Sequence, residues 1–253
     1  MRTATDWARK QLRRFNSTLA RRVGVKLAVA DAGDLADAET RARIDRARAT
    51  TMTSDARLFA LDRAVEYVTR SGLAGAVVEC GVWRGGSMRL AAEALLARGD
   101  AGRELYLYDT YEGMTAPSQA DLDPRGRSAR KLVDGSAQDS QIMARAPLDQ
   151  VRHTLAQSAY PAERIHYVVG RVEDTIPGTI PDAIALLRLD TDWYESTVHE
   201  LVHLFPRLVP GGVLIIDDYG YWQGCRKAVD EYFRDSPILL TFVDDTGVVG
   251  VKR

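Results

Sequence analysis

Hydrophobic and polar positions along this chain form blocks that predict strands and helices in turn. Short apolar runs occupy residues 76–80, 104–108, 165–169, 184–189 and 213–216. Between several of them lie segments with helical spacing, at 54–71, from 87 to about 98, and between 191 and 213. Nearly continuous apolar runs joined by helices are typical of parallel strands covered on both faces, with right-handed connections. The pattern therefore predicts an α/β chain with a doubly wound, mostly parallel sheet.

The two ends of the chain add a hairpin and a helical extension to this sheet. A further helix is predicted over 223–234, and the runs 238–243 and 248–252, hinged at 245–247, read as a hairpin that brings the sheet to seven strands. Residues 1 to about 50 carry two arginine- and alanine-rich helical patterns, broken near 31–34. We therefore predict an N-terminal helical extension over 1–53 and a main domain over 54–253.

A long irregular segment interrupts the alternation of strands and helices at residues 110–146. It contains Pro117, Pro124, Gly126 and Gly135 and many polar residues. A loop of this length within a compact domain is usually functional or disordered. We interpret it as a substrate lid.

Three aspartates follow two of the predicted strands. The run at 184–189 closes on Asp190, and the run at 213–216 closes on Asp217 and Asp218. The carboxyl ends of neighbouring parallel strands share one edge of a sheet, which is where open α/β sheets bind ligands. Solvated turns after the strands would also explain these acids, but three carboxylates at one edge favour a site for a hard cation such as Mg²⁺.

A glycine-rich turn follows the first predicted strand at residues 81–87. A strand, a glycine turn and a helix form a cradle in which the backbone approaches a ligand and the helix amides point at it. The spacing of Gly81, Gly85 and Gly86 is not the G-x-G-x-x-G dinucleotide fingerprint, which argues against pyrophosphate binding. Asp109, after the second strand, is placed to accept hydrogen bonds from ribose hydroxyls, or is a solvated turn residue.

Other residues near these turns have structural interpretations. Asp192, followed by Glu195, fits a capping box at the start of a helix, which we favour over a catalytic role. His199 and His203 share one helical face, but without a third ligand type beside them we favour packing or surface roles over metal binding.

Composition narrows the class of protein. The 253 residues are 45% hydrophobic and 27% charged, with a formal net charge of −1, which gives no electrostatic footprint for nucleic acid. Two cysteines are too few for a disulfide framework, and no long apolar run or signal-peptide pattern predicts a membrane span or export. We expect a cytoplasmic protein that contacts neither nucleic acid nor membrane.

Four stretches in order resemble the macrocin O-methyltransferase family. They are residues 79–87 (ECGVWRGGS), 108–114 (YDTYEGM), 188–197 (RLDTDWYEST) and 216–219 (IDDY), and the resemblance runs from about residue 50 to the C-terminus. It implies the class I S-adenosylmethionine-dependent methyltransferase fold, which ends in a reversed hairpin strand. It also implies methylation of a sugar hydroxyl on a macrolide or related natural product, with S-adenosylmethionine and Mg²⁺ as cofactors.

The resemblance also implies roles for individual residues. The amino-acid part of the cofactor would be held by Glu79, Gly81, Trp83, Arg84 and Ser87. Asp109, with Thr110, would bind the ribose, Val172 and Glu173 would lie near the adenine, and Met52 and Thr53 would close over the methionine end. Asp190, Asp217 and Asp218 would be the metal ligands, with Asp190 or a nearby base accepting the proton of the substrate.

Three other classes of protein remain open from the residues alone. A catechol-type O-methyltransferase would share the fold and the metal but act on an aromatic diol. A nicotinamide-dependent oxidoreductase is disfavoured by the missing fingerprint, and a non-catalytic binding protein would leave the strand-end aspartates without a purpose. A glycoside substrate is expected, and a homo-oligomer is predicted because the N-terminal helices lack an obvious core of their own.

Overall fold

The computed structural model describes residues 36–136 and 143–253 of the chain. Within them, seven strands form one sheet in the order β3-β2-β1-β4-β5-β7-β6. Its parallel part consists of β1 (Ala76–Cys80), β2 (Leu105–Asp109), β3 (Ile165–Val169), β4 (Ile184–Leu189) and β5 (Leu208–Ile216). The strand β7 (Val248–Val251) pairs antiparallel with both β5 and β6 (Leu240–Phe242). The predicted mostly parallel sheet with a reversed hairpin strand is confirmed.

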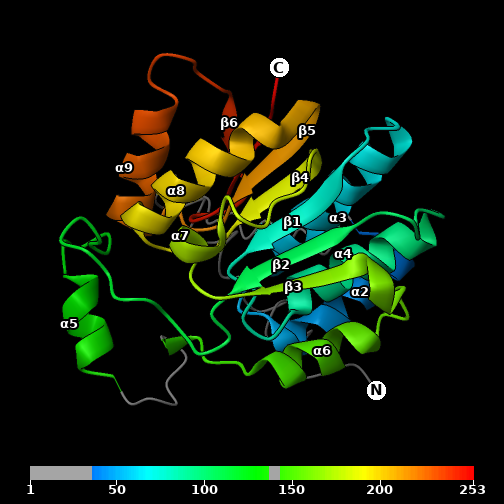
Figure 1. Ribbon diagram of the computed structural model, residues 1–253, viewed down its shortest axis with the longest axis horizontal. Coiled ribbons are helices and arrows are strands. Elements are labelled where there is room, and N and C mark those ends of the chain that lie inside the picture. Colours follow the sequence, from blue (N-terminus) through cyan, green and yellow to red (C-terminus); the bar gives the residue numbers. More distant parts are fainter. Residues whose placement is uncertain (1–35, 137–142) are drawn as a thin grey trace, which may run out of the picture. The chain divides into compact units, whose positions relative to one another are not determined.

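Helices cover both faces of the sheet (Figure 1). One face carries α2 (Ala38–Ala47), α3 (Asp55–Arg70), α4 (Gly86–Ala97) and α6 (Leu148–Ala156), and the other carries α7 (Val172–Thr175), α8 (Tyr194–Leu204) and α9 (Gln223–Tyr232). Single turns of 3₁₀ helix lie at Arg48–Thr50, Ala162–Arg164 and Phe205–Arg207. Because both faces are covered, every residue of β1 and β4 is buried, which explains the absence of polar alternation in these two runs.

The helix α3 illustrates how the local sequence determines an element. The side chain of Ser54 accepts a hydrogen bond from the amide of Arg57 at 3.2 Å, so it caps the first turn as predicted. Leu58, Leu61 and Val65 recur at helical spacing and are buried against the sheet. The helix thus delivers the chain to β1 with its apolar stripe inward.

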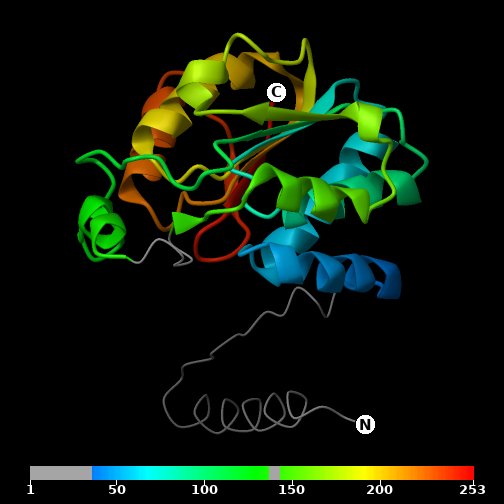
Figure 2. The ribbon, with the colours of Figure 1, turned by 60° about the horizontal axis from the view of Figure 1, so that its bottom comes forward.

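The N-terminal segment is described only from residue 36, so the first of the two predicted N-terminal helices falls outside the described residues. The second helical pattern is α2, which lies beside α3 and α4 (Figure 2). Its residues Ile44 and Ala47 are buried in the same core as those two helices. Arg43 of α2 also forms an ion pair with Asp62 of α3, 2.8 Å from Nε to Oδ1. From α2 onward, the predicted extension therefore packs on the helical layer beside the sheet.

The insertion between β2 and α6 carries the short helix α5 (Ala129–Asp134), which stands apart from the two helical layers (Figure 1). Asp121 ties the base of this insertion to the domain, because its carboxylate accepts hydrogen bonds from the amide of Ser118 at 2.6 Å and that of Tyr194 at 2.8 Å. Trp193 donates its indole N–H to the carbonyl of Thr115 at 3.1 Å. The insertion is therefore anchored beside the start of α8.

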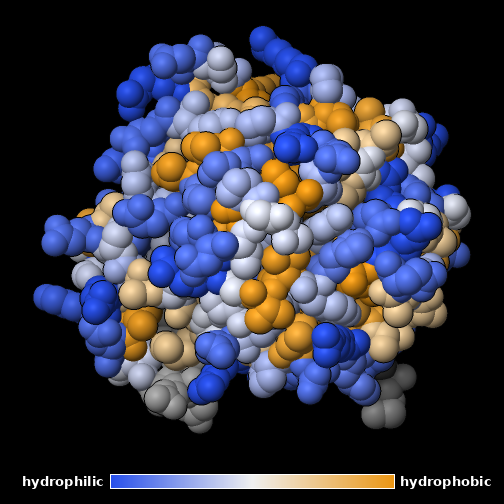
Figure 3. Space-filling view, viewed as in Figure 1, coloured by the Kyte–Doolittle hydropathy of each residue, from blue (hydrophilic) through white to orange (hydrophobic). Residues whose placement is uncertain are grey.

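On the face drawn in Figure 3, hydrophobic side chains form separate groups among polar ones. None of the described helices combines the length and the apolar character that crossing a membrane requires.

Candidate active site

The glycine turn after β1 is held by the carboxylate at the end of β2. Asp109 Oδ2 accepts hydrogen bonds from the amides of Val82 and Trp83 at 2.7 and 2.9 Å, and Oδ1 accepts one from the amide of Tyr111 at 2.7 Å. Burial raises the pKa of Asp109, and these amide hydrogen bonds oppose the rise. The carboxylate thus fixes the turn, in addition to lying where a ribose is expected.

Gly81 occupies a position that no other residue could fill. Its φ is +83°, and a Cβ atom there would lie 2.0 Å from the carbonyl oxygen of Asp190. The close approach brings the loops after β1 and β4 into contact. The glycine turn and Asp190, the first strand-end aspartate, therefore lie against each other at this edge of the sheet.

A cavity opens at this edge of the sheet and contains about 680 Å³ of empty space including its mouth. This is within the range of roughly 300–1,000 Å³ that is usual for small-molecule sites. Seven of the eleven predicted cofactor residues line it: Met52, Gly81, Trp83, Asp109, Thr110, Val172 and Glu173. Asp190 and Asp192 line the same cavity, so the cofactor-type and metal-type residues meet there.

The other four predicted cofactor residues lie around the cavity rather than on its lining. Thr53 and Glu79 are hydrogen-bonded to Arg188, and Ser87 lies 3.3 Å from Thr51 between hydroxyl oxygens. Arg84 stacks over the ring of Trp83, with 4.6 Å between its Cζ atom and the ring centroid.

Three half-buried carboxylates gather at the cavity as a candidate metal centre. Asp190, Asp192 and Asp218 each offer an oxygen, and these oxygens lie within 4.8 Å of one another. Asp218 Oδ2 is buried and has no hydrogen-bond partner among the described residues. Burial and mutual repulsion raise the pKa of Asp190 and of Asp218. A hard divalent cation with oxygen ligands fits this donor set and would relieve the repulsion.

Asp217 does not join this group, although it was predicted together with Asp190 and Asp218. Its side chain is 5% exposed, and its two oxygens are bound by two arginines. Oδ1 accepts a hydrogen bond from Arg188 at 2.5 Å, and Oδ2 pairs with Arg57. In this arrangement the carboxylate of Asp217 balances the positive charges of Arg57 and Arg188. Asp192 takes the place of the third carboxylate in the group.

The predicted capping role of Asp192 is wrong. The helix α8 begins at Tyr194 with Trp193 as its N-cap residue, and Asp192 itself has a φ of +67°. The carboxylate of Asp121, from the insertion, instead accepts the hydrogen bond from the amide of Tyr194. Asp192 is therefore free to face Asp190 and Asp218, and burial beside other carboxylates raises its pKa to about 7.

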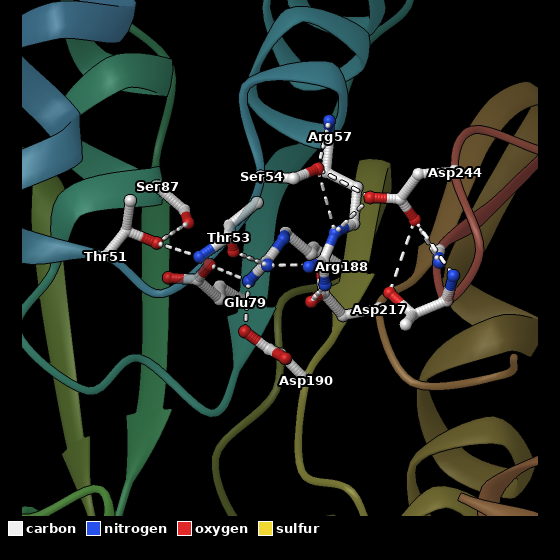
Figure 4. Close-up of polar contacts among 12 residues, drawn as sticks. Thr51, Thr53, Ser54, Arg57, Glu79, Ser87, Arg188, Asp190, Asp217 and Asp244 are labelled. Carbon is white, nitrogen blue, oxygen red and sulfur yellow. Dashed lines mark hydrogen bonds and ion pairs between the residues drawn. The ribbon is translucent and has the colours of Figure 1, made fainter. Parts of the chain in front are cut away.

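Arg188 lies at the centre of the polar contacts of the site, although the sequence pattern predicted no role for it (Figure 4). It lies within β4, is 2% exposed, and its guanidinium contacts Glu79, Asp190, Asp217 and Thr53. An arginine inside an otherwise apolar strand was the available signal, because a buried charge requires partners. Burial raises the pKa of Glu79 to about 7 even though Arg188 acts in the opposite direction.

The two histidines of α8 have packing and hydrogen-bonding roles, as favoured from the sequence. Their rings lie 4.5 Å apart between centroids, and His199 Nε2 is 2.9 Å from the carbonyl oxygen of Ile176. Among the described residues, the carboxylate group that could hold a metal contains neither histidine.

The seven-stranded sheet with its reversed last hairpin strand, and the cavity over the glycine turn, define a class I S-adenosylmethionine-dependent methyltransferase. The solved structure of the O-methyltransferase NovP matches this chain with a TM-score of 0.70 and 31% identity, over 80% of this chain and 82% of that chain. The chain belongs to the macrocin-O-methyltransferase (TylF) family, whose model matches residues 4–251. It is therefore an O-methyltransferase, and its methyl donor is S-adenosylmethionine.

Two curated relatives are named for reactions on natural products. The chain is 38% identical, over 79% of its length and 74% of the relative, to the 8-demethyl-8-(2,3-dimethoxy-alpha-L-rhamnosyl)-tetracenomycin-C 4′-O-methyltransferase of Streptomyces olivaceus. It is 33% identical, over 73% of its length and 70% of the relative, to the mycinamicin III 3″-O-methyltransferase of Micromonospora griseorubida.

Proposed function

We propose that this enzyme methylates a sugar hydroxyl of a glycosylated natural product, with Mg²⁺ bound at the strand-end aspartates. The observation that carries the proposal is the cluster of Asp190, Asp192 and Asp218, of which Asp190 and Asp192 line the cavity where the donor is expected. The tetracenomycin relative, named for a rhamnosyl compound, supports a sugar as the acceptor.

The cofactor would lie along the cavity with its parts on different elements. The residues around β1 and the glycine turn would bind its amino-acid part: Glu79, Gly81, Trp83, Arg84 and Ser87. The ribose falls to Asp109 and Thr110, the adenine to Val172 and Glu173, and Met52 and Thr53 would close over the methionine end. The buried Oε2 of Glu79 has no hydrogen-bond partner within the described part of the chain, and this supports the assignment because an ammonium group would satisfy it.

The aspartates explain how a poorly acidic hydroxyl could react. A sugar hydroxyl is about as reluctant to ionise as water, whose pKa is about 15.7, while an ordinary aspartate has a pKa of about 3.9. At about 1.36 kcal/mol per pKa unit, proton transfer to such an aspartate would cost about 16 kcal/mol. Bound Mg²⁺ would supply the Lewis acid that lowers the pKa of the hydroxyl.

Geometry contributes the rest of the barrier reduction. Cavity walls that align the hydroxyl with the methyl group could supply about 7 to 11 kcal/mol. The insertion at 110–146 is proposed as the lid, because Gly113, Met114 and Thr115 line the cavity while its base is anchored through Asp121. In this scheme Asp190 both binds the metal and accepts the proton.

The third metal ligand distinguishes two versions of this site. The family resemblance favours Asp217, whereas the geometry favours Asp192, and calorimetric titration of Mg²⁺ into Asp217→Asn and Asp192→Asn separates them. The variant that removes the true metal ligand should bind Mg²⁺ at least tenfold more weakly than the parent, a loss of about 1.4 kcal/mol, and Asp218→Asn should do the same. Asp149→Asn, on a carboxylate that is 95% exposed, is the matched control and should leave the affinity unchanged.

Calorimetric titrations of the parent enzyme with cofactor and substrate analogues test the function itself. S-adenosylhomocysteine should bind the parent enzyme, and a glycoside with adjacent hydroxyls should bind only when Mg²⁺ is present. Failure of S-adenosylhomocysteine to bind would refute the cofactor assignment. Glycoside binding that survives a chelator would refute the metal assignment.

The homo-oligomer expected from the N-terminal helices is also a proposal. Light scattering of the full chain should give a mass of at least two subunits, and a monomeric mass at micromolar concentration would refute it.

A further inference from the structure

The guanidinium of Arg188 joins four separate segments of the chain at the floor of the site (Figure 4). Its Nη1 donates to Glu79 Oε1 of β1 at 2.5 Å and to Asp190 Oδ2 after β4 at 2.7 Å. Its Nη2 donates to Asp217 Oδ1 after β5 at 2.5 Å and to Thr53 Oγ1 before α3 at 2.7 Å. The register of β1 and β4 places Glu79 directly opposite Arg188, so the first contact follows from the sheet itself.

These partners belong to the two halves of the site. Glu79 and Thr53 are on the proposed cofactor side, and Asp190 is on the proposed metal side. The planar guanidinium holds its donors in a fixed fork, so a shift of one carboxylate is transmitted to the others.

Thr53 belongs to a short segment that is held at several points. Thr51 contacts Ser87 at the start of α4, with 3.3 Å between hydroxyl oxygens, and Ser54 donates to Asp244 Oδ2 at 2.5 Å. Met52, between these contacts, lines the cavity and is 49% exposed. The Thr53–Arg188 hydrogen bond is therefore the link between this segment and the carboxylates beneath it.

We infer that Arg188 is a positioning residue that aligns the cofactor-binding carboxylate Glu79 with the metal-binding carboxylate Asp190 and holds the Thr51–Ser54 segment over the donor. This inference rests on the proposed function. Arg188 contacts neither the reacting hydroxyl nor the methyl group in this scheme. It acts through the groups that do.

Arg188→Lys is the primary test, because it keeps the positive charge and removes the fork. The lysine ammonium has three hydrogen-bond donors at one point and a shorter overall reach than the guanidinium, so it cannot serve four acceptors on four segments. Calorimetry should show S-adenosylhomocysteine and Mg²⁺ each binding at least tenfold more weakly than in the parent, with circular dichroism confirming the fold.

Arg43→Lys is the matched control. Arg43 is also buried and forked, donating to Asp62 Oδ1 at 2.8 Å and to Thr40 Oγ1 at 2.9 Å, but it lies on α2 away from the cavity. It should lower thermal stability and leave both affinities within twofold of the parent. A purely structural role for Arg188 would make the two variants behave alike.

Thr53→Val keeps the test decisive if Arg188→Lys does not fold. This nearly isosteric change removes one hydrogen bond on the cofactor side, so it should weaken S-adenosylhomocysteine about three- to tenfold and leave Mg²⁺ affinity within twofold. Where Arg188→Lys does fold, a double-mutant cycle of the two substitutions should show losses in S-adenosylhomocysteine affinity that are less than additive.

The outcomes separate this inference from the proposed function. A parent enzyme that binds neither S-adenosylhomocysteine nor Mg²⁺ overturns the proposed function. A parent that binds both, beside Arg188→Lys or Thr53→Val variants with unchanged affinities, overturns the role of Arg188 alone.

Discussion

Replacing Glu79 with glutamine should change how the stability of the protein depends on pH. Glu79 is 1% exposed, and burial raises its pKa from 4.5 to about 7. The folded protein therefore holds a proton on Glu79 in a range where the unfolded chain has lost it. The contribution of this group to stability is fully present below the unfolded pKa of about 4.5 and is lost as the pH rises through about 7.

The size of the effect follows from the pKa. At about 1.36 kcal/mol per pKa unit, the rise corresponds to roughly 3 kcal/mol when integrated over the full range. Glutamine does not titrate, so the free energy of unfolding of Glu79→Gln should rise by about 2 to 3 kcal/mol relative to that of the parent between pH 5 and pH 8. The remaining buried carboxylates titrate in both proteins, so most of their contribution cancels in the difference.

Urea unfolding at pH 5, 6, 7 and 8, in a chelator and without cofactor, measures this difference directly. Glu66→Gln is the control, because hydrogen bonding to Arg70 lowers the pKa of Glu66 and places its titration below this range. That variant should differ from the parent by a constant amount from pH 6 to pH 8. A difference between Glu79→Gln and the parent that stays flat or falls with pH would refute the reasoning.

Two further substitutions test the architecture of the site. Gly81→Ala should abolish S-adenosylhomocysteine binding and lower the melting temperature, because the new Cβ would meet the carbonyl of Asp190 at 2.0 Å; normal binding in a calorimeter would contradict this. Asp121→Ala should destabilise the protein by about 3 to 5 kcal/mol, through lost hydrogen bonds from Ser118 and Tyr194 to a buried carboxylate. This corresponds to a fall in melting temperature of roughly 6 to 10 °C by calorimetry, and a fall below about 2 °C would be too small for an anchor of the insertion.

The sheet and its ligand-binding edge were predictable because each depends on local pattern. Runs such as 184–189 are apolar except for Arg188, since helices cover both faces of the sheet, and Asp190 follows at the point where the strand leaves the core. The cap of α3 at Ser54 was predictable for the same reason, since the capping residue lies beside its own helix.

The arrangement of the aspartates depends on residues far apart in the chain, which local pattern does not reveal. Asp217 is bound by Arg57, which lies 160 positions earlier, and by Arg188 on the neighbouring strand. Asp192 was expected to cap α8, but Asp121, 73 positions before Tyr194, accepts that hydrogen bond. Contacts from the folded insertion, the start of α3 and Arg188 of β4 together decide which carboxylates face the cavity.

Transfer of a labelled methyl group tests the central proposal most directly. The enzyme would be incubated with S-adenosylmethionine carrying a trideuterated methyl group and a panel of rhamnosylated and other glycosylated aglycones, alongside simple catechols, with Mg²⁺ or with a chelator. The account predicts a product about 17 mass units heavier than the acceptor, because CD₃ replaces the hydrogen of a single hydroxyl. The label should lie on the sugar and should appear only when Mg²⁺ is present. Labelling of catechols alone, or labelling of a sugar that persists in the chelator, would contradict it.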